Sequence, residues 1–276
     1  QNLHLRASKI EFTWEMGVQL KSGNTPMTLF ELPTLTLVVI AVGFICGGLV
    51  KGALGAGLPA VALPIMVMQV EPAFAVSLFV VPVMISNIWQ IRHGGQYREA
   101  MRRFWPFLTM LAIGVWIGAG ALTAVDPNIM AVVLGVIVIV STAAQMFAGE
   151  LTFFDKRARI IHPVAGGVLG IASGASGVFT PTIVYFAALR LEKDLFVTQL
   201  ALVAMIGSVT MYARLAAGGW LNGPQMLAST AALVPAAVGL LIGFWIRERM
   251  SEAAFRRAVS IALIALGCAL VVKGVA

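Results

Sequence analysis

Backbone groups exposed by glycine can bind anions, and the sequence carries two glycine-rich stretches that suit this chemistry. They occupy residues 47–57 and 166–177, and each interrupts a long apolar run and is followed by a proline. A broken helix presents unpaired N–H groups and a partial positive charge at its N-terminus, which together attract an anion. At membrane depth, a break survives only when it is buried in protein or lines a cavity. Two such breaks in corresponding halves of a chain predict the substrate site of a transporter.

Two cations lie inside apolar stretches. Lys51 stands within the first glycine-rich stretch, and Arg214 lies about a turn and a half inside the end of an apolar segment. An ionisable residue in a membrane segment is a functional candidate by default, although long side chains also reach the interface from helix ends. Each cation is therefore interpreted either as a counter-charge for the substrate or as an interfacial anchor.

Neutral polar side chains complete the set of candidate ligands. Ser176 and Thr180 flank the second glycine-rich stretch, where their hydroxyls can bond to an anion or to their own backbone. Asn87 and Gln199 lie in corresponding parts of the two halves, and an amide is costly to bury unless it binds a ligand or joins two helices. The predicted substrate-binding residues are Lys51, Gly55, Gly57, Asn87, Gly174, Ser176, Gly177, Thr180, Gln199 and Arg214.

Acidic side chains are absent from the predicted membrane segments. None of the 12 Asp and Glu residues falls inside a segment, and the three His residues lie in the N-terminal tail or near loops. The sequence therefore predicts no catalytic residues, no metal site and no cofactor. It argues against proton coupling through a buried carboxylate, and favours facilitated flow or coupling through backbone carbonyls or the substrate's own proton.

The composition indicates the compartment. The 276 residues are 59% apolar and 11% charged, with a mean hydropathy of +0.93, which predicts a polytopic membrane protein. The net charge of +7 does not indicate nucleic-acid binding, because most of the 19 Lys and Arg residues cluster between apolar segments. The two cysteines lie inside apolar segments and are interpreted as small buried apolar side chains. The expected partners are the lipid bilayer and a small anionic substrate, with no nucleic acid.

The elements that must position these candidates are apolar segments of two lengths. The segments 58–70 and 179–189 are too short to span a bilayer and contain or adjoin prolines, so each is predicted to form an in-and-out helical hairpin with the segment before it. The expected fold is an all-α polytopic membrane protein with two such hairpins of broken helices plus six full transmembrane helices. The segments are about 34–54, 58–70, 73–91, 104–124, 128–149, 163–177, 179–189, 195–216, 226–246 and 253–273.

Basic clusters orient the chain. Those at residues 92–103, 156–159 and 247–257 are predicted to face the cytoplasm, because positively charged loops stay on that side. The turns at residues 71–72, 126–128 and 220–224 contain no Lys or Arg and are predicted to be external, whereas residues 190–194 are predicted to form another cytoplasmic loop. This arrangement places both termini outside the cytoplasm.

The two halves align as repeats of opposite orientation. Superposing Gly55 on Gly174 requires a shift of 119 residues, and superposing Arg92 on Arg214 requires 122. Arg92 adjoins a predicted cytoplasmic loop whereas Arg214 approaches an external one, which is the inversion expected of an alternating-access transporter. The predicted organisation is a tail at 1–33, a first repeat at 34–149, a cytoplasmic linker at 150–162 and a second, inverted repeat at 163–276.

The glycine motifs resemble those of a known family. Residues 52–57 followed by Pro64, and residues 174–177 followed by Pro181, are similar to the paired motifs of the TauE/SafE sulfite exporters, also called toluene sulfonate uptake permeases. The resemblance extends over roughly residues 34–275.

Two positions depart from that family pattern. Leu58 stands where a third glycine is frequent, and Val178 stands where a proline is common. The resemblance implies transport of sulfite, sulfoacetate or a taurine-related sulfonate across the bacterial inner membrane, with periplasmic termini and a monomer or homodimer. The alternatives are an integral membrane enzyme acting on lipid, which would need intramembrane acid-base or metal groups, and a structural assembly subunit.

Overall fold

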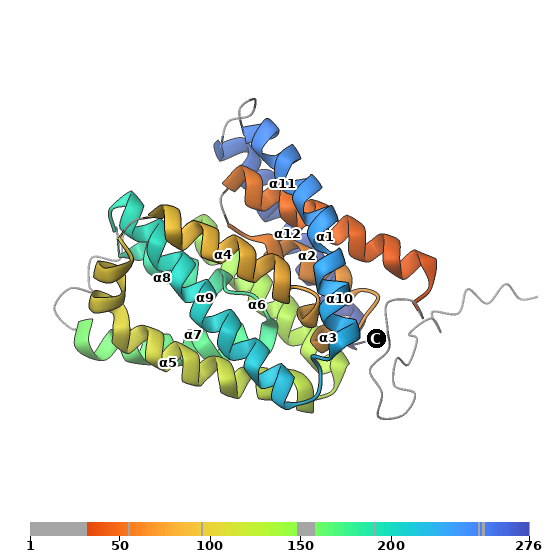
Figure 1. Ribbon diagram of the computed structural model, residues 1–276, viewed down its shortest axis with the longest axis horizontal. Helices are drawn as coiled ribbons and strands as arrows, with labels where there is room; N and C mark the ends of the chain where they lie inside the picture. The colour runs from red at the N-terminus through yellow and green to blue at the C-terminus, as the bar shows by residue number, and fades with distance from the viewer. Residues whose placement is uncertain are drawn as a thin grey trace, which may run out of the picture.

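A computed structural model of the chain describes residues 32–54, 56–94, 96–147, 158–189, 191–247, 249 and 252–275. The regular secondary structure of these residues is α-helical throughout (Figure 1), which confirms the all-α prediction. Most of the predicted tail and linker, and Gly55, lie outside the described residues. The helices are α1 (Thr34–Leu54), α2 (Leu58–Val67), α3 (Pro72–Ser77), α4 (Val80–Gly94), α5 (Tyr97–Ala124), α6 (Pro127–Phe147), α7 (Ala158–Ser176), α8 (Thr180–Ala188), α9 (Lys193–Ala217), α10 (Gly223–Ala231), α11 (Leu233–Arg247) and α12 (Glu252–Val275).

Two short helices, α2 and α8, each follow a glycine with a positive φ. Gly57 is the N-cap of α2 with a φ of 104°, and Gly177 has a φ of 75° in the turn between α7 and α8. Glycine adopts this left-handed region without steric cost, and a proline within the first two positions of each short helix favours a new helical start. With 10 and 9 residues, α2 and α8 are too short to span a bilayer, as the sequence predicts.

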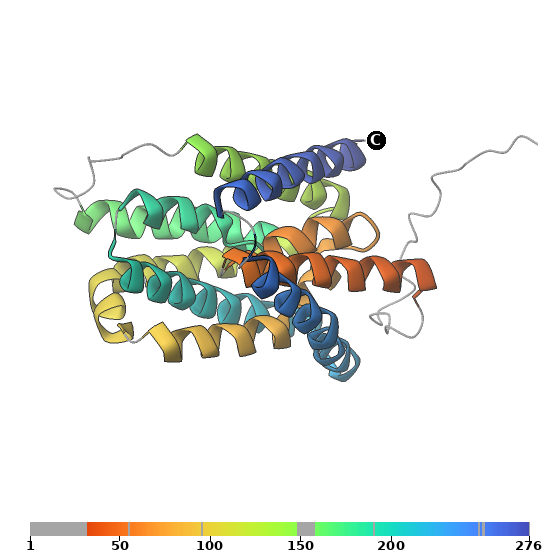
Figure 2. The same ribbon diagram turned by 90° about the horizontal axis from the view of Figure 1, so that it is seen from above.

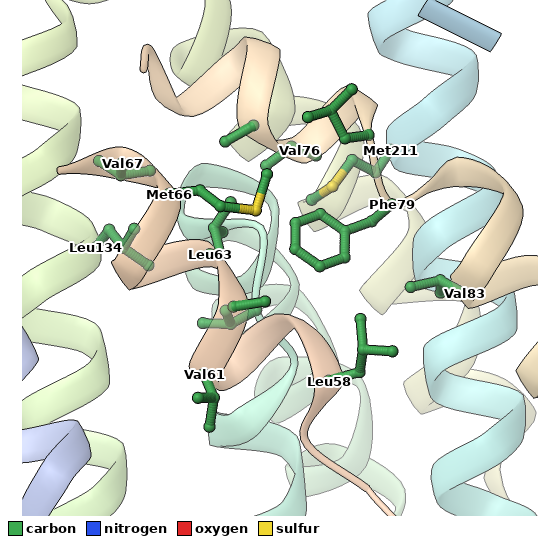
Figure 3. Close-up of a cluster of buried hydrophobic side chains, with 14 of the residues drawn as sticks. Leu58, Val61, Leu63, Met66, Val67, Val76, Phe79, Val83, Leu134 and Met211 are labelled. Carbon is green, nitrogen blue, oxygen red and sulfur yellow. The ribbon is translucent and has the colours of Figure 1, made fainter. Parts of the chain in front are cut away.

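The hairpins α1–α2 and α7–α8 enter from opposite ends of the molecule, and their turns lie near its middle (Figure 1 and Figure 2). A Cβ added at Gly177 would lie 2.6 Å from Val76 Cγ2 and 2.9 Å from Leu63 Cδ2, so the second turn rests on α2 and α3. Figure 3 shows the apolar side chains that surround Leu63, which come from α2, α3, α4, α6 and α9. The two hairpins therefore meet through a buried apolar contact.

Long helices from each half of the chain pack against helices of the other half. Helix α5 packs along α7, and α11 packs along α1. Gly170 of α7 lies against Gly114 of α5, and Gly52 of α1 lies against Gly243 of α11; an added Cβ on Gly170 or Gly52 would stand 3.1 Å from the partner's Cα. Gly52 and Gly170 are 118 residues apart, close to the shift of 119 seen in the sequence. The small-residue spacings thus serve packing within the chain.

Two further pairs join corresponding helices of the two halves. Helix α6 packs on α12 with Gly135 facing Gly267, and α4 packs on α9. Helices α4 and α9 lie side by side and run antiparallel (Figure 1 and Figure 2). An inverted duplication would produce these pairings, and the division of the chain into two repeats remains our prediction.

The predicted segment 73–91 is divided into α3 and α4 by a turn at Leu78 and Phe79. Pro82 lacks the N–H that would bond to the carbonyl of Leu78 in a continuous helix. Ser229 of α10 replaces that donor, since its hydroxyl donates to Leu78 O at 2.8 Å and accepts from Val81 N at 2.9 Å. This contact joins residues 151 positions apart, so no local sequence pattern reveals it.

The outer surface of the helices is apolar. Leu227, Val168 and Val272 are each more than half exposed, as expected for side chains that face lipid. Cys268 is also exposed on α12, so it is not the buried side chain that the sequence suggested, whereas Cys46 is partly buried. Among the described residues, six stretches are long and apolar enough to cross a membrane: Thr34–Leu54, Tyr97–Ala124, Pro127–Met146, Asp194–Ala217, Gly223–Ile246 and Ala254–Val275.

Lys273 of α12 closes the C-terminal end of α2. Its Nζ donates to Val67 O at 2.7 Å and to Met68 O at 3.1 Å, which are carbonyls that a helix end leaves unpaired. We expect Lys273→Met to lower the free energy of unfolding by about 1 to 2 kcal/mol, and Lys273→Arg to keep most of this stabilisation because the cation remains. The thermal midpoint in detergent measures the effect, and an unchanged midpoint for Lys273→Met would contradict it.

Candidate functional site

Both short helices begin without a side-chain cap. The N-cap positions of α2 and α8 are Gly57 and Phe179, and neither side chain accepts a hydrogen bond from its helix. By contrast, Asn222 caps α10 by accepting a bond from Gln225 N at 3.1 Å. The first N–H groups of a helix have no partner within it, so α2 and α8 keep donors for another acceptor.

Lys51 lies in the last turn of α1 and reaches α4. Its Nζ donates to Ser86 Oγ at 2.8 Å, and that hydroxyl donates to Val83 O at 3.0 Å. An ammonium carries three donors, so this bond leaves others free for a ligand. No Asp or Glu occurs in α1, α2 or α4, so these helices do not compensate the charge of Lys51.

Asn87 of α4 and Gln199 of α9 are buried amides with polar atoms that have no hydrogen-bond partner among the described residues. Asn87, which follows Ser86 on α4, is 2% exposed, and Gln199 on α9 is fully buried. Within the described part of the chain, Nδ2 of Asn87 and both Oε1 and Nε2 of Gln199 have no partner. Buried polar atoms nearly always have one, and each orphan costs about 1 to 3 kcal/mol. An unpaired amide at this depth therefore points to a ligand.

The packing of α4 on α9 places the two amides at the same level. Ile91 of α4 and Leu195 of α9 belong to one small cluster of apolar side chains near the ends of these helices. Because the helices are antiparallel, Asn87 and Gln199 each stand four residues nearer the middle than these two. Lys51 joins the same region through Ser86, the neighbour of Asn87.

Two hydroxyls that the sequence prediction did not select have the same property. Ser173 on α7 and Thr198 on α9 are fully buried, and their hydroxyl oxygens have no partner among the described residues. Ser173 adjoins Gly174 in the second glycine-rich stretch, and this position in the sequence is a signal that could have identified it as a site residue. Thr198 gives no such signal, because a threonine in a helix usually bonds to its own backbone.

Three other predicted residues sit at or beside the second turn. Ser176 Oγ donates to Ala172 O at 2.7 Å and accepts from Val178 N at 3.4 Å, so it holds the turn itself. Gly174 lies against Val115 of α5 and allows the two helices to approach. Thr180 is the first residue of α8 and is buried.

Arg214 lies apart from the other candidates. Its Cζ is 5.9 Å from the ring centroid of Trp116, and its guanidinium also lies beside Gly120 of α5. The interval from Gln199 to Arg214 corresponds to roughly 22 Å along α9. The structure therefore places Asn87 and Gln199 at a similar level on neighbouring helices, with Lys51 bonded to the residue before Asn87, and it leaves Arg214 near the other end of α9.

These groups offer hydrogen-bond donors and one cation within an interior that is mostly apolar. A ligand with several oxygen acceptors and a negative charge satisfies such a set, since charge-assisted hydrogen bonds are the stronger kind. In the part of the chain that the structure describes, no group of three or more His, Cys, Asp and Glu side chains could hold a metal ion.

Comparison with known proteins gives one match. The family model described as Sulfite exporter TauE/SafE matches residues 39–270, a region that begins within α1 and contains α2, α4, α7, α8 and α9. No curated protein and no solved structure matches the chain.

Proposed function

Because the chain belongs to the sulfite exporter TauE/SafE family, we propose that it is a permease or exporter for a small sulfur-containing anion, either sulfite or an organosulfonate. The observation that carries this proposal is Gln199, a fully buried amide whose two polar atoms have no partner among the described residues. In this proposal the protein is not an enzyme. It lies in the bacterial inner membrane with both termini in the periplasm.

The proposed site lies between α4 and α9. Lys51 supplies the counter-charge, and the amides of Asn87 and Gln199 donate to the substrate's oxygens. The hydroxyls of Ser173 and Thr198 add two further donors. Ser176 and Gly174 have structural roles in this proposal, and Arg214 is an interfacial anchor.

Access to this site requires movement, because Asn87 and Gln199 are shut off from solvent. The hairpins α1–α2 and α7–α8 are the elements that we propose to move, each within one of the two inverted repeats at 34–149 and 163–276. Each is held at the end remote from its turn. Lys273 bonds the end of α2, and His162 of α7 is hydrogen bonded to Tyr185 of α8. Alternate release of these bonds would open the site to one side at a time.

A binding experiment tests the proposed substrate class. Detergent-solubilised protein is heated with sulfite, sulfate, thiosulfate, taurine, sulfoacetate or an aromatic sulfonate, with chloride at equal ionic strength as the control. A ligand of the folded state at 100 times its dissociation constant adds about 2.7 kcal/mol of stability, so the true substrate will raise the thermal midpoint. A set of midpoints no higher than that in chloride would contradict the proposal.

Lys51→Met tests the counter-charge. We expect it to weaken anion binding roughly 10-fold to 150-fold, the equivalent of losing a hydrogen bond to a charged group. Lys51→Arg should retain binding because the cation remains, and Arg249→Met, which removes an exposed cation beyond the end of α11, should leave affinity unchanged. Titration of each variant with the best ligand from the panel measures the difference, and equal affinity of Lys51→Met and the unmodified protein would remove Lys51 from the site.

A further inference from the structure

The first two turns of α5 form a separate basic segment across one end of the molecule. Phe104 has non-helical backbone angles (φ −114°, ψ 16°), which kink α5 between Tyr97–Arg103 and the remainder of the helix. This segment crosses the end of the molecule at which α4 ends and α9 begins (Figure 1). Ala100 anchors it by packing with Leu195 and Leu202 of α9.

Three arginines project from this segment into a common hollow. Arg98, Arg102 and Arg103 line an open cavity of about 600 Å³ together with Glu99. All three arginines are exposed, and three cations against one carboxylate leave the cavity positively charged. Arg98 donates to the neighbouring Tyr97 hydroxyl, and Arg103 lies over the ring of Phe104. The guanidinium groups retain donors for an anion such as a phosphate.

An apolar groove lies between α7 and α8. It has a volume of about 500 Å³ and is lined by Val164, Val168 and other aliphatic residues of α7, and by Pro181, Val184 and Tyr185 of α8. In the matching hairpin, Gly43 and Gly47 let α1 approach Met66 and Ala62 of α2 closely. Branched side chains on α7 thus hold α8 at a distance.

A series of side-chain contacts leads from the basic cavity to the groove. Arg103 Cζ is 5.3 Å from the centroid of the Phe104 ring, which lies 5.2 Å from the ring of His162. His162 is hydrogen bonded to Tyr185, one of the residues that line the groove. The chemistry of the two parts matches a molecule with a phosphate and a long apolar tail, since one part is cationic and the other is apolar.

We propose that this surface binds an anionic phospholipid, with its headgroup phosphate among Arg98, Arg102 and Arg103 and one acyl chain in the α7–α8 groove. The charge of the cavity selects the headgroup, and the groove opens on the apolar outer surface, where Val164 and Val168 are 61% exposed. The acyl chain fills the space that the branched side chains of α7 leave beside α8. This inference concerns binding at the outer surface and is independent of the proposed substrate.

The test measures lipid binding directly. Purified full-length protein in detergent is titrated with phosphatidylglycerol or with phosphatidylcholine of the same acyl chains, and bound lipid is counted by native mass spectrometry. We expect phosphatidylglycerol to bind in preference to phosphatidylcholine. The triple variant Arg98→Gln, Arg102→Gln, Arg103→Gln should bind phosphatidylglycerol roughly 100-fold more weakly, because each basic residue near an anionic headgroup contributes to the attraction.

Matched variants distinguish lipid binding at the headgroup site from non-specific attraction to positive charge. The triple variant Arg249→Gln, Arg256→Gln, Arg257→Gln removes the same charge elsewhere and should bind phosphatidylglycerol as the unmodified protein does. An equal loss in both triple variants would overturn the proposal in favour of non-specific attraction.

The groove has its own control. Val168→Trp fills it and should weaken phosphatidylglycerol binding, whereas Val272→Trp, on the exposed face of α12, should not. Soluble glycerol 3-phosphate lacks the acyl chain and should fail to compete with the lipid. Effective competition, or an unaffected Val168→Trp variant, would show that the groove takes no part and would overturn the proposed lipid.

Discussion

Replacing Gln199 with methionine will abolish transport and will raise the stability of the protein. Methionine has nearly the shape of glutamine but makes no comparable hydrogen bonds. Gln199 is fully buried and both its amide atoms lack partners in the described structure, a burden of about 1 to 3 kcal/mol for each orphaned group. Removing the amide relieves that burden in the empty protein. It also deletes hydrogen bonds to the charged substrate, which will reduce affinity roughly 10-fold to 150-fold for each bond lost.

The opposite signs of these two effects separate a ligand from a structural residue. If the amide of Gln199 instead joined two helices, its replacement would lower the stability of the protein, because its hydrogen-bond partner would be left unpaired. Thr142→Val is the matched control, since Thr142 on α6 is buried with an unpartnered hydroxyl but lies outside the proposed site. We expect Thr142→Val to raise the thermal midpoint without affecting transport. A fall in the midpoint of Gln199→Met would contradict the assignment.

Replacing Gly177 with alanine will destabilise the protein strongly. The φ of 75° at Gly177 is unfavourable for alanine by about 1 to 2 kcal/mol. The new Cβ would in addition lie 2.6 Å from Val76 and 2.9 Å from Leu63. Such overpacking costs about 1 to 3 kcal/mol more. Because these contacts join the two hairpins, transport will fall as well.

Gly219 provides a control with a similar positive φ. Its φ is 78°, and an added Cβ would meet nothing within 4 Å. Gly219→Ala should therefore show the backbone cost alone. Thermal midpoints of the two variants in detergent give the comparison, and equal losses would mean that the hairpins do not meet at Gly177.

The paired hairpins were predictable because their signals are local. A glycine run ending in a left-handed residue and followed by a proline breaks a helix wherever it occurs, as at Gly57 and Gly177. The spacing between the two halves also appears in the structure. Gly52 lies where α1 crosses α11, and Gly170 lies where α7 crosses α5. These features depend on backbone geometry and composition, which a sequence displays directly.

The convergence of the site was less predictable because it depends on helix register. Polarity alone makes Arg214 as strong a candidate as Gln199, yet the two residues lie near opposite ends of α9. Thr198 looks like any helical threonine until its hydroxyl is found buried without a partner. The division of α3 from α4 is likewise completed by Ser229, a partner from the other half of the chain.

The most direct test of the central claim is uptake of radiolabelled sulfite or sulfonate into proteoliposomes that contain the unmodified protein, Gln199→Met or Thr142→Val. The proposed site predicts saturable uptake by the unmodified protein and by Thr142→Val, and uptake by Gln199→Met no higher than in protein-free liposomes. Saturable uptake by Gln199→Met at the rate of the unmodified protein would contradict a substrate site between α4 and α9.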